Sequence, residues 1–459
     1  MKAKVYFVGA GGIGMAALVR WCLSKGLKVA GYDRTPSALT QALAKEGAAI
    51  SYDNAMDAVP AAFRNPADTL VIYTPAVPAE NIPLSYFRQG GFEVIKRSAA
   101  LGHLTAGMKT LAFSGTHGKT TTSSMAAHLL HTAPVGCTAF LGGILRNYNS
   151  NLLLSDTSPW AVAEADEYDR SFHTLRPWIA VVTATDPDHL DIYGNEDNYL
   201  ESFAHFTELV QPGGALIVHT GLKLKPRPQQ GVKVYTYSRD AGDFHAADIR
   251  RPEGRIIFDF VGPDGMTVRD IELGVPVEIN IENAVAAIAA VMLTGDVDAD
   301  SVRRAMASFQ GAERRFQFWL RQPLPGGHVL IDDYAHHPDE LRQSIASVRA
   351  LYPGRRLAVV FQPHLYTRTR DFAPQFAQAL SQADALLLLD IYPARELPIE
   401  GVTSKIIFDK VKCQEKMMIS KEKLVETVKS LNFDILLTVG AGDISLCLPA
   451  LYAALTSEK

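Results

Sequence analysis

The sequence predicts an α/β protein of three domains, each built around a parallel β-sheet. With 459 residues the chain is too long for one ordinary hydrophobic core, and usual domain sizes divide it into about three. Apolar strands run into glycine turns near residues 9–14 and 115–118, and a helical pattern follows each turn. Beyond residue 316, strands alternate with helices of about 10 to 15 residues, which is typical of a parallel sheet covered on both faces.

The first domain begins with a strand, a glycine turn, a helix and a second strand. The first strand covers 4–10, the helical pattern runs to Leu23, and the second strand covers 28–32 and leads to Asp33. Glycines in such a turn let a diphosphate approach the backbone at the helix N-terminus, and an acidic residue about 20 positions on bonds a ribose hydroxyl. The pattern indicates a nucleotide diphosphate without specifying which one, and a purely structural glycine turn remains an alternative.

The second domain contains the most specific motif of the chain, TLAFSGTHGKTTT at 110–122. A strand that enters a glycine loop turns successive backbone N–H groups toward one point, and the next helix adds the positive end of its dipole. We expect Lys119 to reach the outer phosphates of a nucleoside triphosphate and the Thr120 hydroxyl to bind Mg²⁺. The loop is shorter than the general motif, which has glycine where this chain has Phe113, so a simple glycine turn remains the alternative.

Two polar runs at predicted strand ends supply candidate ligands for a metal ion. One strand leads into the acidic run 164–169, and the next leads into the run 186–191. Ligands gather beyond the carboxyl ends of parallel strands, so both runs are expected to point toward the phosphate loop. Mg²⁺ prefers oxygen ligands, which makes Glu164 the first candidate and His189 the second. The alternatives are a solvated turn for the acidic run and a structural role for His189.

The third domain also carries polar runs at predicted strand ends. DDYAHHP at 332–338 follows one strand, and QPHLYTRTR at 362–370 follows the next. The planar fork of arginine matches carboxylates and phosphates, so Arg368 and Arg370 are candidate anion clamps. An exposed surface pair is the alternative for these two arginines.

Composition narrows the class of protein. Hydrophobic residues make up 47% of the chain and charged residues 20%, as in a globular protein. No apolar run approaches the roughly 20 residues that cross a bilayer, and the N-terminus lacks a signal-peptide pattern, so we expect a cytoplasmic protein without membrane contact. The net charge of -4 argues against a nucleic-acid partner. The widely spaced cysteines are expected to be buried free thiols: Cys22, Cys137, Cys413 and Cys447.

Two stretches give weaker signals. Residues 222–255 begin with GLKLKPRPQQG and are expected to form a loop and hairpin excursion. Residues 405–429 are rich in lysine and predict no particular structure.

Taken together, the motifs resemble those of the ATP-dependent Mur ligases, which build the peptide stem of bacterial peptidoglycan. The resemblance covers nearly the whole chain, and the pairing of the last two motifs is similar to the branch that joins L-alanine to UDP-N-acetylmuramate. The alternative branch recycles a whole tripeptide onto the same acceptor. The motifs are GAGGIGM at 9–15, GTHGKTTT at 115–122, EADEYDRSF at 164–172, DHLDIYG at 188–194, NIENA at 280–284, ERRF at 313–316, DDYAHHP at 332–338 and FQPHLYTRTRDF at 361–372.

The resemblance implies a division of labour among three domains. Residues 1–106 would form a Rossmann-like domain that binds the UDP-sugar, and residues 107–315 a central P-loop domain that binds ATP. Residues 316–459 would form a second Rossmann-like domain that binds the amino acid. No nicotinamide is then expected at the first glycine turn.

The resemblance also implies roles for individual residues. Those expected at the UDP-sugar are Gly11, Gly12, Ile13, Gly14, Met15, Asp33 and Arg97. Those expected at ATP are Gly115, Thr116, His117, Gly118, Lys119, Thr120, Thr121, Asn283 and Arg315. Mg²⁺ is assigned to Thr120, Glu164 and His189, and the amino acid to Tyr334, His336, His364 and Arg368. The expected catalytic residues are Lys119, His189, His336 and Arg368.

The implied reaction has two steps, with ATP and Mg²⁺ as cofactors. The muramoyl carboxylate attacks the γ-phosphate of ATP, and the amine of L-alanine then displaces phosphate from the acyl phosphate. Two negatively charged reactants meet in the first step, so the site must provide positioned cations. Because ATP and the amino acid bind different domains, catalysis is expected to require domain closure. The oligomeric state, monomer or dimer, is left open.

The chain departs from the family pattern at three places. Ile279 precedes Asn280 where relatives often have His-Asn, so the adenine contact is expected to rest on Asn283. Leu365 stands where many relatives have arginine, which places more weight on Arg368. No lysine lies between His189 and Lys223, so no carbamylated lysine is expected. Two other classes stay open: a nicotinamide-dependent oxidoreductase, and an inactive sensor of UDP-sugar or ATP.

Overall fold

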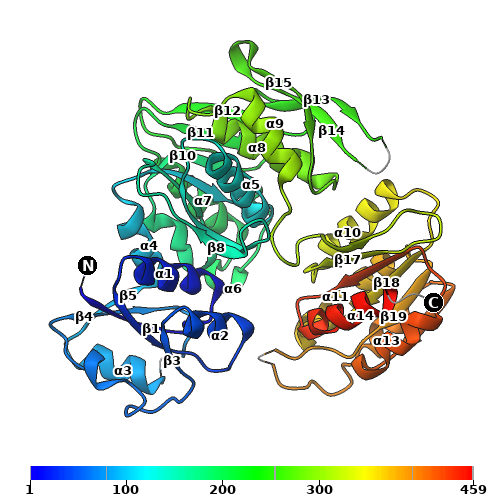
Figure 1. The fold of residues 1–459 in the computed structure, drawn as a ribbon, viewed down its shortest axis with the longest axis horizontal. Coiled ribbons are helices and arrows are strands. Elements are labelled where there is room, and N and C mark those ends of the chain that lie inside the picture. The colour runs from blue at the N-terminus through cyan, green and yellow to red at the C-terminus, as the bar shows by residue number, and fades with distance from the viewer. Residues whose placement is uncertain (1, 79, 253–254, 395, 457–459) are drawn as a thin grey trace. The chain divides into compact units, whose positions relative to one another are not determined.

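The computed structural model describes residues 2–78, 80–252, 255–394 and 396–456. The chain forms two compact units (Figure 1). The first comprises Met1–Ile249, Ile257–Glu272 and Ile281–Phe309, and the second comprises Arg250–Ile256, Leu273–Asn280 and Gln310–Lys459. The α/β class and the parallel sheets predicted from the sequence are confirmed.

The N-terminal sheet of the first unit is parallel throughout and has the order β3-β2-β1-β4-β5. The strand order reverses between β1 and β4, and the crevice beyond their carboxyl ends is where ligands bind in such sheets. The glycine turn follows β1 and therefore lies at this point. The strands are β1 Lys4–Val8, β2 Lys28–Tyr32, β3 Ala49–Ser51, β4 Thr69–Tyr73 and β5 Glu93–Lys96; the helices are α1 Ile13–Ser24, α2 Ala38–Lys45, α3 Ile82–Gln89 and α4 Arg97–Thr105.

The central sheet of the same unit has the order β12-β11-β10-β6-β9-β7-β8. All neighbours are parallel except β7 and β8. The phosphate loop follows β6, so the carboxyl ends of β9 and β10 flank it on either side. The strands are β6 Lys109–Ser114, β7 Thr138–Leu145, β8 Ser150–Leu153, β9 Trp160–Glu164, β10 Pro177–Val182, β11 Ala215–His219 and β12 Lys233–Tyr237; the helices are α5 Lys119–Thr132, α6 Leu190–Tyr193, α7 Glu196–Glu208, α8 Ile279–Met292 and α9 Ala299–Ser308, with the 3₁₀ segment η2 Tyr168–Thr174.

The N-terminal and central sheets share one continuous hydrophobic core. Val5 and Phe7 of the first sheet, Phe140 and Ala163 of the second, and apolar residues of α1 belong to a single buried cluster. A hydrogen bond also connects the central sheet to α1. The side-chain Nδ2 of buried Asn151 on β8 donates to the carbonyl of Ile13 at 2.6 Å. Elements far apart in the sequence are thereby held against one another within this unit.

The stretch 222–255 contains strands in two different sheets. β12 pairs in parallel with β11, and β13 His245–Arg250 joins β14 Ile257–Val261 and β15 Thr267–Glu272 in a separate three-stranded sheet. The predicted hairpin excursion was therefore wrong. Local residue patterns do not reveal which distant strand is the partner, and parallel pairing excludes a hairpin.

The second unit contains a sheet of order β16-β17-β21-β18-β19-β20, parallel except for the edge strand β16. β21 lies between β17 and β18, so the polar runs after these three strands share one edge. The Lys-rich stretch forms α12, β20 and α13. The elements are β16 Gln317–Arg321, β17 Val329–Asp333, α10 Pro338–Leu351, β18 Leu357–Phe361, α11 Tyr366–Leu380, β19 Ala385–Leu388, α12 Lys405–Phe408, β20 Glu415–Met418, α13 Lys421–Ser430, β21 Ile435–Val439 and α14 Leu448–Thr456.

Two other sequence predictions concern membranes and cysteines. Among the helices that the structure describes, none is long and apolar enough to span a bilayer. All four cysteines are free thiols, and Cys22 and Cys137 are buried as predicted. Cys413 and Cys447, both in the second unit, are only partly buried, so the prediction of burial was wrong for these two.

Candidate active site

The first glycine turn is fixed by hydrogen bonds to the second strand. Gly9 has φ +87°, a conformation that favours glycine, and its N–H and that of Ala10 donate to the carbonyl of Tyr32 at 2.8 and 3.0 Å. One carboxylate oxygen of Asp33 accepts a hydrogen bond from the Gly11 N–H at 2.7 Å. The acid predicted to bind ribose thus holds the turn itself.

A cavity of about 270 Å³ opens beside this turn and contains most of the residues predicted for the UDP-sugar. Arg97 begins α4 and reaches across the turn, since a Cβ atom on Gly14 would lie 2.6 Å from its Nη1 atom. Its Nη2 atom donates to Asp166 Oδ2 at 3.1 Å. The cavity is lined by Gly12, Ile13, Gly14, Met15, Arg97, Glu164 and Asp166, among others, whereas Gly11 and Asp33 are not part of its lining.

The phosphate loop has a backbone that requires glycine at both ends. Gly115 has φ +137°, and a Cβ atom there would overlap the Thr183 hydroxyl and lie 2.6 Å from the backbone nitrogen of Ala184. Gly118 has φ +85° and is the N-cap of α5, so Lys119, Thr120 and Thr121 form the first turn of that helix. The residues that follow β10 contact this loop.

The contacts between the β10 end and the loop use hydroxyl groups. Thr183 Oγ1 donates to the carbonyl of His117 at 2.5 Å, and Thr116 Oγ1 donates to that of Asp186 at 2.7 Å. The backbone also contributes, because the Thr116 N–H donates to the carbonyl of Ala184 at 3.1 Å. The other N–H groups of the loop are the natural donors for phosphate.

Lys119 is held by a carboxylate that the sequence did not single out. Its Nζ atom lies 2.8 Å from Glu167 Oε1 and donates to the carbonyl of Gly115 at 2.6 Å. The side chains of Lys119 and Glu167 are 14% and 2% exposed. Burial acts to lower the pKa of Lys119, but the charges of Glu167 and Glu164 outweigh it, so the pKa is raised and the ammonium stays protonated.

The end of β9 offers oxygen atoms that fit a divalent cation. Glu164 Oε2 and Glu167 Oε2 are buried, and neither has a hydrogen-bond partner within the described parts of the chain. Gly142 on β7 leaves the space that the Glu164 carboxylate fills, since a Cβ atom would overlap it. Buried carboxylate oxygens without partners are unusual, and Mg²⁺ is a ligand of matching chemistry.

His189, the second metal candidate, lies farther along the β10 end. It has φ +51°, its ring packs edge-on against Tyr168 with centroids 5.1 Å apart, and its Nε2 atom is 3.7 Å from Asp188 Oδ2. No group of three or more His, Cys, Asp or Glu side chains suited to a metal occurs among the described residues. A metal at Glu164 and His189 would therefore need phosphate oxygens or water as further ligands.

Asn283 lies directly behind the phosphate loop. Its Oδ1 atom accepts a hydrogen bond from Thr122 Oγ1 at 3.2 Å, and a Cβ atom on Gly118 would lie 2.9 Å from it. Asn280, the other asparagine of the motif, donates from Nδ2 to the carbonyl of Val275 and so fixes the start of α8. The structure thus brings Asn283 to the loop and leaves Asn280 with a structural contact.

In the second unit, the neighbouring arginines 314 and 315 have different surroundings. Arg314 Nε lies 3.2 Å from Asp332 Oδ2, and its terminal nitrogens donate to the carbonyls of Gly440 and Gly442 at 2.5 and 3.1 Å. Arg314 therefore connects the end of β17 to the loop that follows β21. Both guanidinium groups lie over the ring of Tyr334, that of Arg314 at 5.1 Å and that of Arg315, the predicted ATP contact, at 5.4 Å.

The DDYAHHP run and the polar run after β18 meet at the same edge of this sheet. His336 Nδ1 lies 3.0 Å from the carbonyl of Tyr334, and the rings of His336 and His364 are 6.0 Å apart. Burial lowers the pKa of His336, and the charges of Arg368 and Arg315 lower it further, against the opposing effect of Glu340. The His336 imidazole is therefore neutral at neutral pH. The structure brings Tyr334, His336, His364 and Arg368 together in one cluster.

Sequence reasoning missed several residues that hold these groups: Asp166, Glu167, Arg314 and Glu340. The acidic run was recognised, but each acid's partner lies far away in the chain; Asp166 and Glu167 bond residues 69 and 48 positions apart. Glu340 Oε2 accepts from the backbone N–H groups of His336 and His337. Its position three residues after His337, at a helix start, is a capping-box signal that could have identified it.

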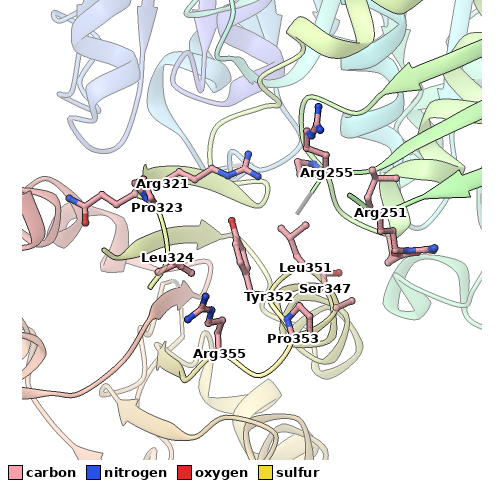
Figure 2. A pocket seen from close by; sticks show the side chains of 15 residues that line it. Arg251, Arg255, Arg321, Pro323, Leu324, Ser347, Leu351, Tyr352, Pro353 and Arg355 are labelled. Atoms are coloured by element: carbon pink, nitrogen blue, oxygen red, sulfur yellow. The ribbon is translucent and has the colours of Figure 1, made fainter. Parts of the chain in front are cut away.

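A second cavity, of about 680 Å³, lies in the second unit and contains none of the predicted site residues. Figure 2 shows four arginines around it, Arg251, Arg255, Arg321 and Arg355, with the Tyr352 ring among them. Arg251 is neutralised by Glu278, which it bonds at 2.6 and 2.9 Å.

Family models match the chain in three consecutive parts. Residues 4–109 match "Mur ligase family, catalytic domain", residues 113–291 match "Mur ligase middle domain", and residues 314–451 match "Mur ligase, glutamate ligase domain". The predicted three-domain fold is confirmed by these matches.

Individual proteins extend the similarity over the full length. The UDP-N-acetylmuramate–L-alanine ligase of Phocaeicola vulgatus is 56% identical over 456 residues, covering 99% of this chain and 98% of the relative. The protein of the same name from Porphyromonas gingivalis is 50% identical, with 96% of each chain covered. The solved UDP-N-acetylmuramate–alanine ligase of Thermotoga maritima has a TM-score of 0.82 at 27% identity, covering 99% of this chain and 100% of that one. The chain belongs to the Mur ligase family.

Proposed function

We propose that the chain joins L-alanine to the carboxylate of UDP-N-acetylmuramate in an ATP-dependent reaction that releases ADP and phosphate. The observation that carries the proposal is the acidic segment 164–169, which contacts Lys119 of the phosphate loop and Arg97 of the glycine-turn cavity. An acceptor carboxylate and a γ-phosphate have to meet for this reaction, and the segment lies between the two cations that suit them. The names of relatives at 50 and 56% identity support L-alanine as the amino acid.

The first site holds the acceptor. The diphosphate of UDP-N-acetylmuramate approaches the backbone of Gly12 and Gly14 at the N-terminus of α1, where the helix dipole is positive. Arg97 binds the same acceptor with its guanidinium group. Gly11, Ile13, Met15 and Asp33 complete this site in our proposal.

The second site holds ATP. Residues 115–121 cradle the phosphates, Lys119 binds the outer ones, and Asn283 contacts the adenine. Thr120, Glu164 and His189 would hold Mg²⁺, which when bound supplies positive charge between the phosphates and the acceptor carboxylate. Arg315 adds a further cation from the second unit.

In the first step, an oxygen of the acceptor carboxylate attacks the γ-phosphorus, and the bond to the bridging oxygen of ADP breaks. Lys119 and Arg315 stabilise the charge that develops on the transferred group. In the second step, the neutral amine of L-alanine attacks the acyl carbon and phosphate leaves. His336, Arg368, Tyr334 and His364 orient the amino acid. A neutral His336 suits this step because it does not repel the ammonium form of the amino acid, which loses a proton before its amine attacks.

The proposal includes the domain limits 1–106, 107–315 and 316–459 and requires closure of the amino-acid domain on the ATP domain. Substrates of this kind place the reaction in the cytoplasm, where both nucleotides occur. Small-angle scattering that does not change on addition of nucleotide and acceptor would contradict the closure.

Phosphate release tests the proposal. The purified chain is given ATP, Mg²⁺ and UDP-N-acetylmuramate, and then L-alanine, glycine, L-serine or the murein tripeptide in separate reactions. We expect release that depends on L-alanine, with weaker release for glycine and L-serine, because a small pocket discriminates one methylene by only about 1 to 3 kcal/mol. Release with tripeptide alone would reassign the chain to the recycling branch, and binding without release would make it a sensor.

A further inference from the structure

The segment 166–169 contributes one acid to each of three ion pairs. Asp166 bonds Arg97 at 3.1 Å, Glu167 bonds Lys119 at 2.8 Å, and Asp169 lies 2.7 Å from Lys96. Arg97 belongs to the proposed acceptor site and Lys119 to the proposed nucleotide site. Two consecutive residues of one loop therefore hold the principal cation of two different sites.

The pair between Lys119 and Glu167 must change when a nucleotide binds. The ammonium is folded back onto the loop, where it donates to the carbonyl of Gly115 as well as to Glu167. Outer phosphates bound at this loop require the same ammonium. Losing it takes from the nearly fully buried Glu167 carboxylate the cation that pairs with it, which is strongly unfavourable until another positive charge, such as that of Mg²⁺, offsets it.

The backbone links Glu167 to its neighbours tightly. The Glu167 carbonyl accepts from the Tyr193 hydroxyl at 2.5 Å and from the Arg170 N–H at 3.0 Å. Asp169 and Arg170 are both in the left-handed region, with φ +52° and +54°, which is unfavourable for residues other than glycine. The carbonyl of Asp166 accepts from the Phe172 N–H at 2.9 Å, so hydrogen bonds close the segment into one turn that contains both Asp166 and Glu167.

We propose that Asp166 and Glu167 are positioning residues that couple the acceptor site to the nucleotide site. In the structure Glu167 holds Lys119 and Asp166 holds Arg97. An anionic group that binds either cation releases its acid, and movement of the shared turn weakens the other pair. Acceptor and nucleotide therefore bind with positive cooperativity, and Glu167 lowers nucleotide affinity until the acceptor is present. The inference rests on the proposed function of the two sites.

Calorimetric titration tests the coupling with a non-hydrolysable ATP analogue and Mg²⁺, in the absence and presence of saturating UDP-N-acetylmuramate. For the wild type we expect the acceptor to lower the Kd of the analogue by about 5- to 50-fold, within the usual range of coupling between sites. Glu167→Gln should bind the analogue several-fold more tightly without acceptor, and the ratio of the two Kd values should fall toward one. Asp166→Asn should also reduce the ratio, with little change in the Kd measured without acceptor.

Asp169→Asn is the matched control, because it removes an acid of the same turn that holds neither Arg97 nor Lys119. Asp169→Asn should keep the wild-type ratio of the two Kd values. Glu167→Asp should show part of the ratio that Glu167→Gln loses. An unchanged ratio in both Glu167→Gln and Asp166→Asn, or an equal loss in Asp169→Asn, overturns the coupling. Wild type that binds both ligands with a ratio of one overturns the coupling alone, whereas wild type that binds neither overturns the proposed function as well.

Discussion

The chain contains two glycine turns of similar design that obtain their cation in different ways. Each follows the middle strand of a parallel sheet and opens a helix, with Gly12 as the N-cap of α1 and Gly118 as the N-cap of α5. In the second turn the cation is the next residue, Lys119. In the first turn the cation is Arg97. This residue begins α4, which follows β5, and its side chain reaches back over Gly14.

The difference explains what each turn can hold. A lysine built into the loop lies among the phosphates of one ligand and is suited to their outermost charge. An arginine from another element spans a cavity, so it binds a group that extends away from the turn. The first turn therefore suits a substrate with a long body, and the second suits a triphosphate whose end must be activated.

The largest expected effect comes from removing the cation of the second turn. Lys119→Met should lower kcat roughly 100- to 1000-fold, the range seen when one preorganised transition-state donor is lost. Phosphate release under saturating substrates measures it, with Lys45→Met, at the exposed end of α2, as the control. Activity within tenfold of wild type would show that Lys119 does not act on the transferred phosphate.

Removing the cation of the first turn should act on substrate affinity. Arg97→Gln should raise KM for UDP-N-acetylmuramate roughly 10- to 100-fold, because a hydrogen bond to a charged group contributes about 1.5 to 3 kcal/mol. The control is Lys96→Gln, which removes a neighbouring and more exposed cation that pairs with Asp169. Equal effects of the two substitutions would contradict a specific role for Arg97.

A methyl group added to each turn should have different consequences. In Gly14→Ala the new Cβ meets only the end of a flexible side chain, Arg97, so KM for the acceptor should rise several-fold while stability changes little. In Gly115→Ala the new Cβ meets the backbone of Ala184, and residue 115 has φ +137°, which is unfavourable for alanine. The melting temperature should therefore fall by several degrees. Thermal unfolding and steady-state kinetics of both variants distinguish the two cases; a larger melting change in Gly14→Ala would reverse the comparison.

The smallest effect concerns α8, the helix that carries Asn283 behind the second turn. His219 Nε2 lies 2.6 Å from Glu282 Oε1 on this helix. The hydrogen bond that the His219 imidazolium donates to Glu282 raises the pKa of His219, so the stabilisation is fully present below the unfolded-state pKa and is lost as pH rises through the higher folded-state pKa. His219→Gln should therefore lower the melting temperature more at pH 6 than at pH 9. His245→Gln, on β13, is the control, and a deficit that grows toward pH 9 would contradict the assignment.

The sequence revealed the features that are local in the chain. Strand β2 has its predicted limits, 28–32, and the Lys119 position follows from its place directly after the loop. The pairing of Lys119 with Glu167 and of Arg97 with Asp166 has no local signal, because the four acidic residues of the run 164–169 are equivalent until the fold selects among them. The small sheet β13-β14-β15 was missed for the same reason, since its pairing depends on segments that the sequence does not distinguish from loops.

Binding of each ligand to each single variant tests the central claim, that the two glycine turns hold different substrates. Titration calorimetry measures the Kd of UDP-N-acetylmuramate and of the non-hydrolysable ATP analogue with Mg²⁺, each alone, for wild type, Lys119→Met and Arg97→Gln. Our account predicts that Lys119→Met loses affinity for the analogue and keeps that for the acceptor, and that Arg97→Gln shows the reverse. Loss of the acceptor in Lys119→Met with the analogue still bound, or loss of both ligands in either variant at an unchanged melting temperature, would contradict it.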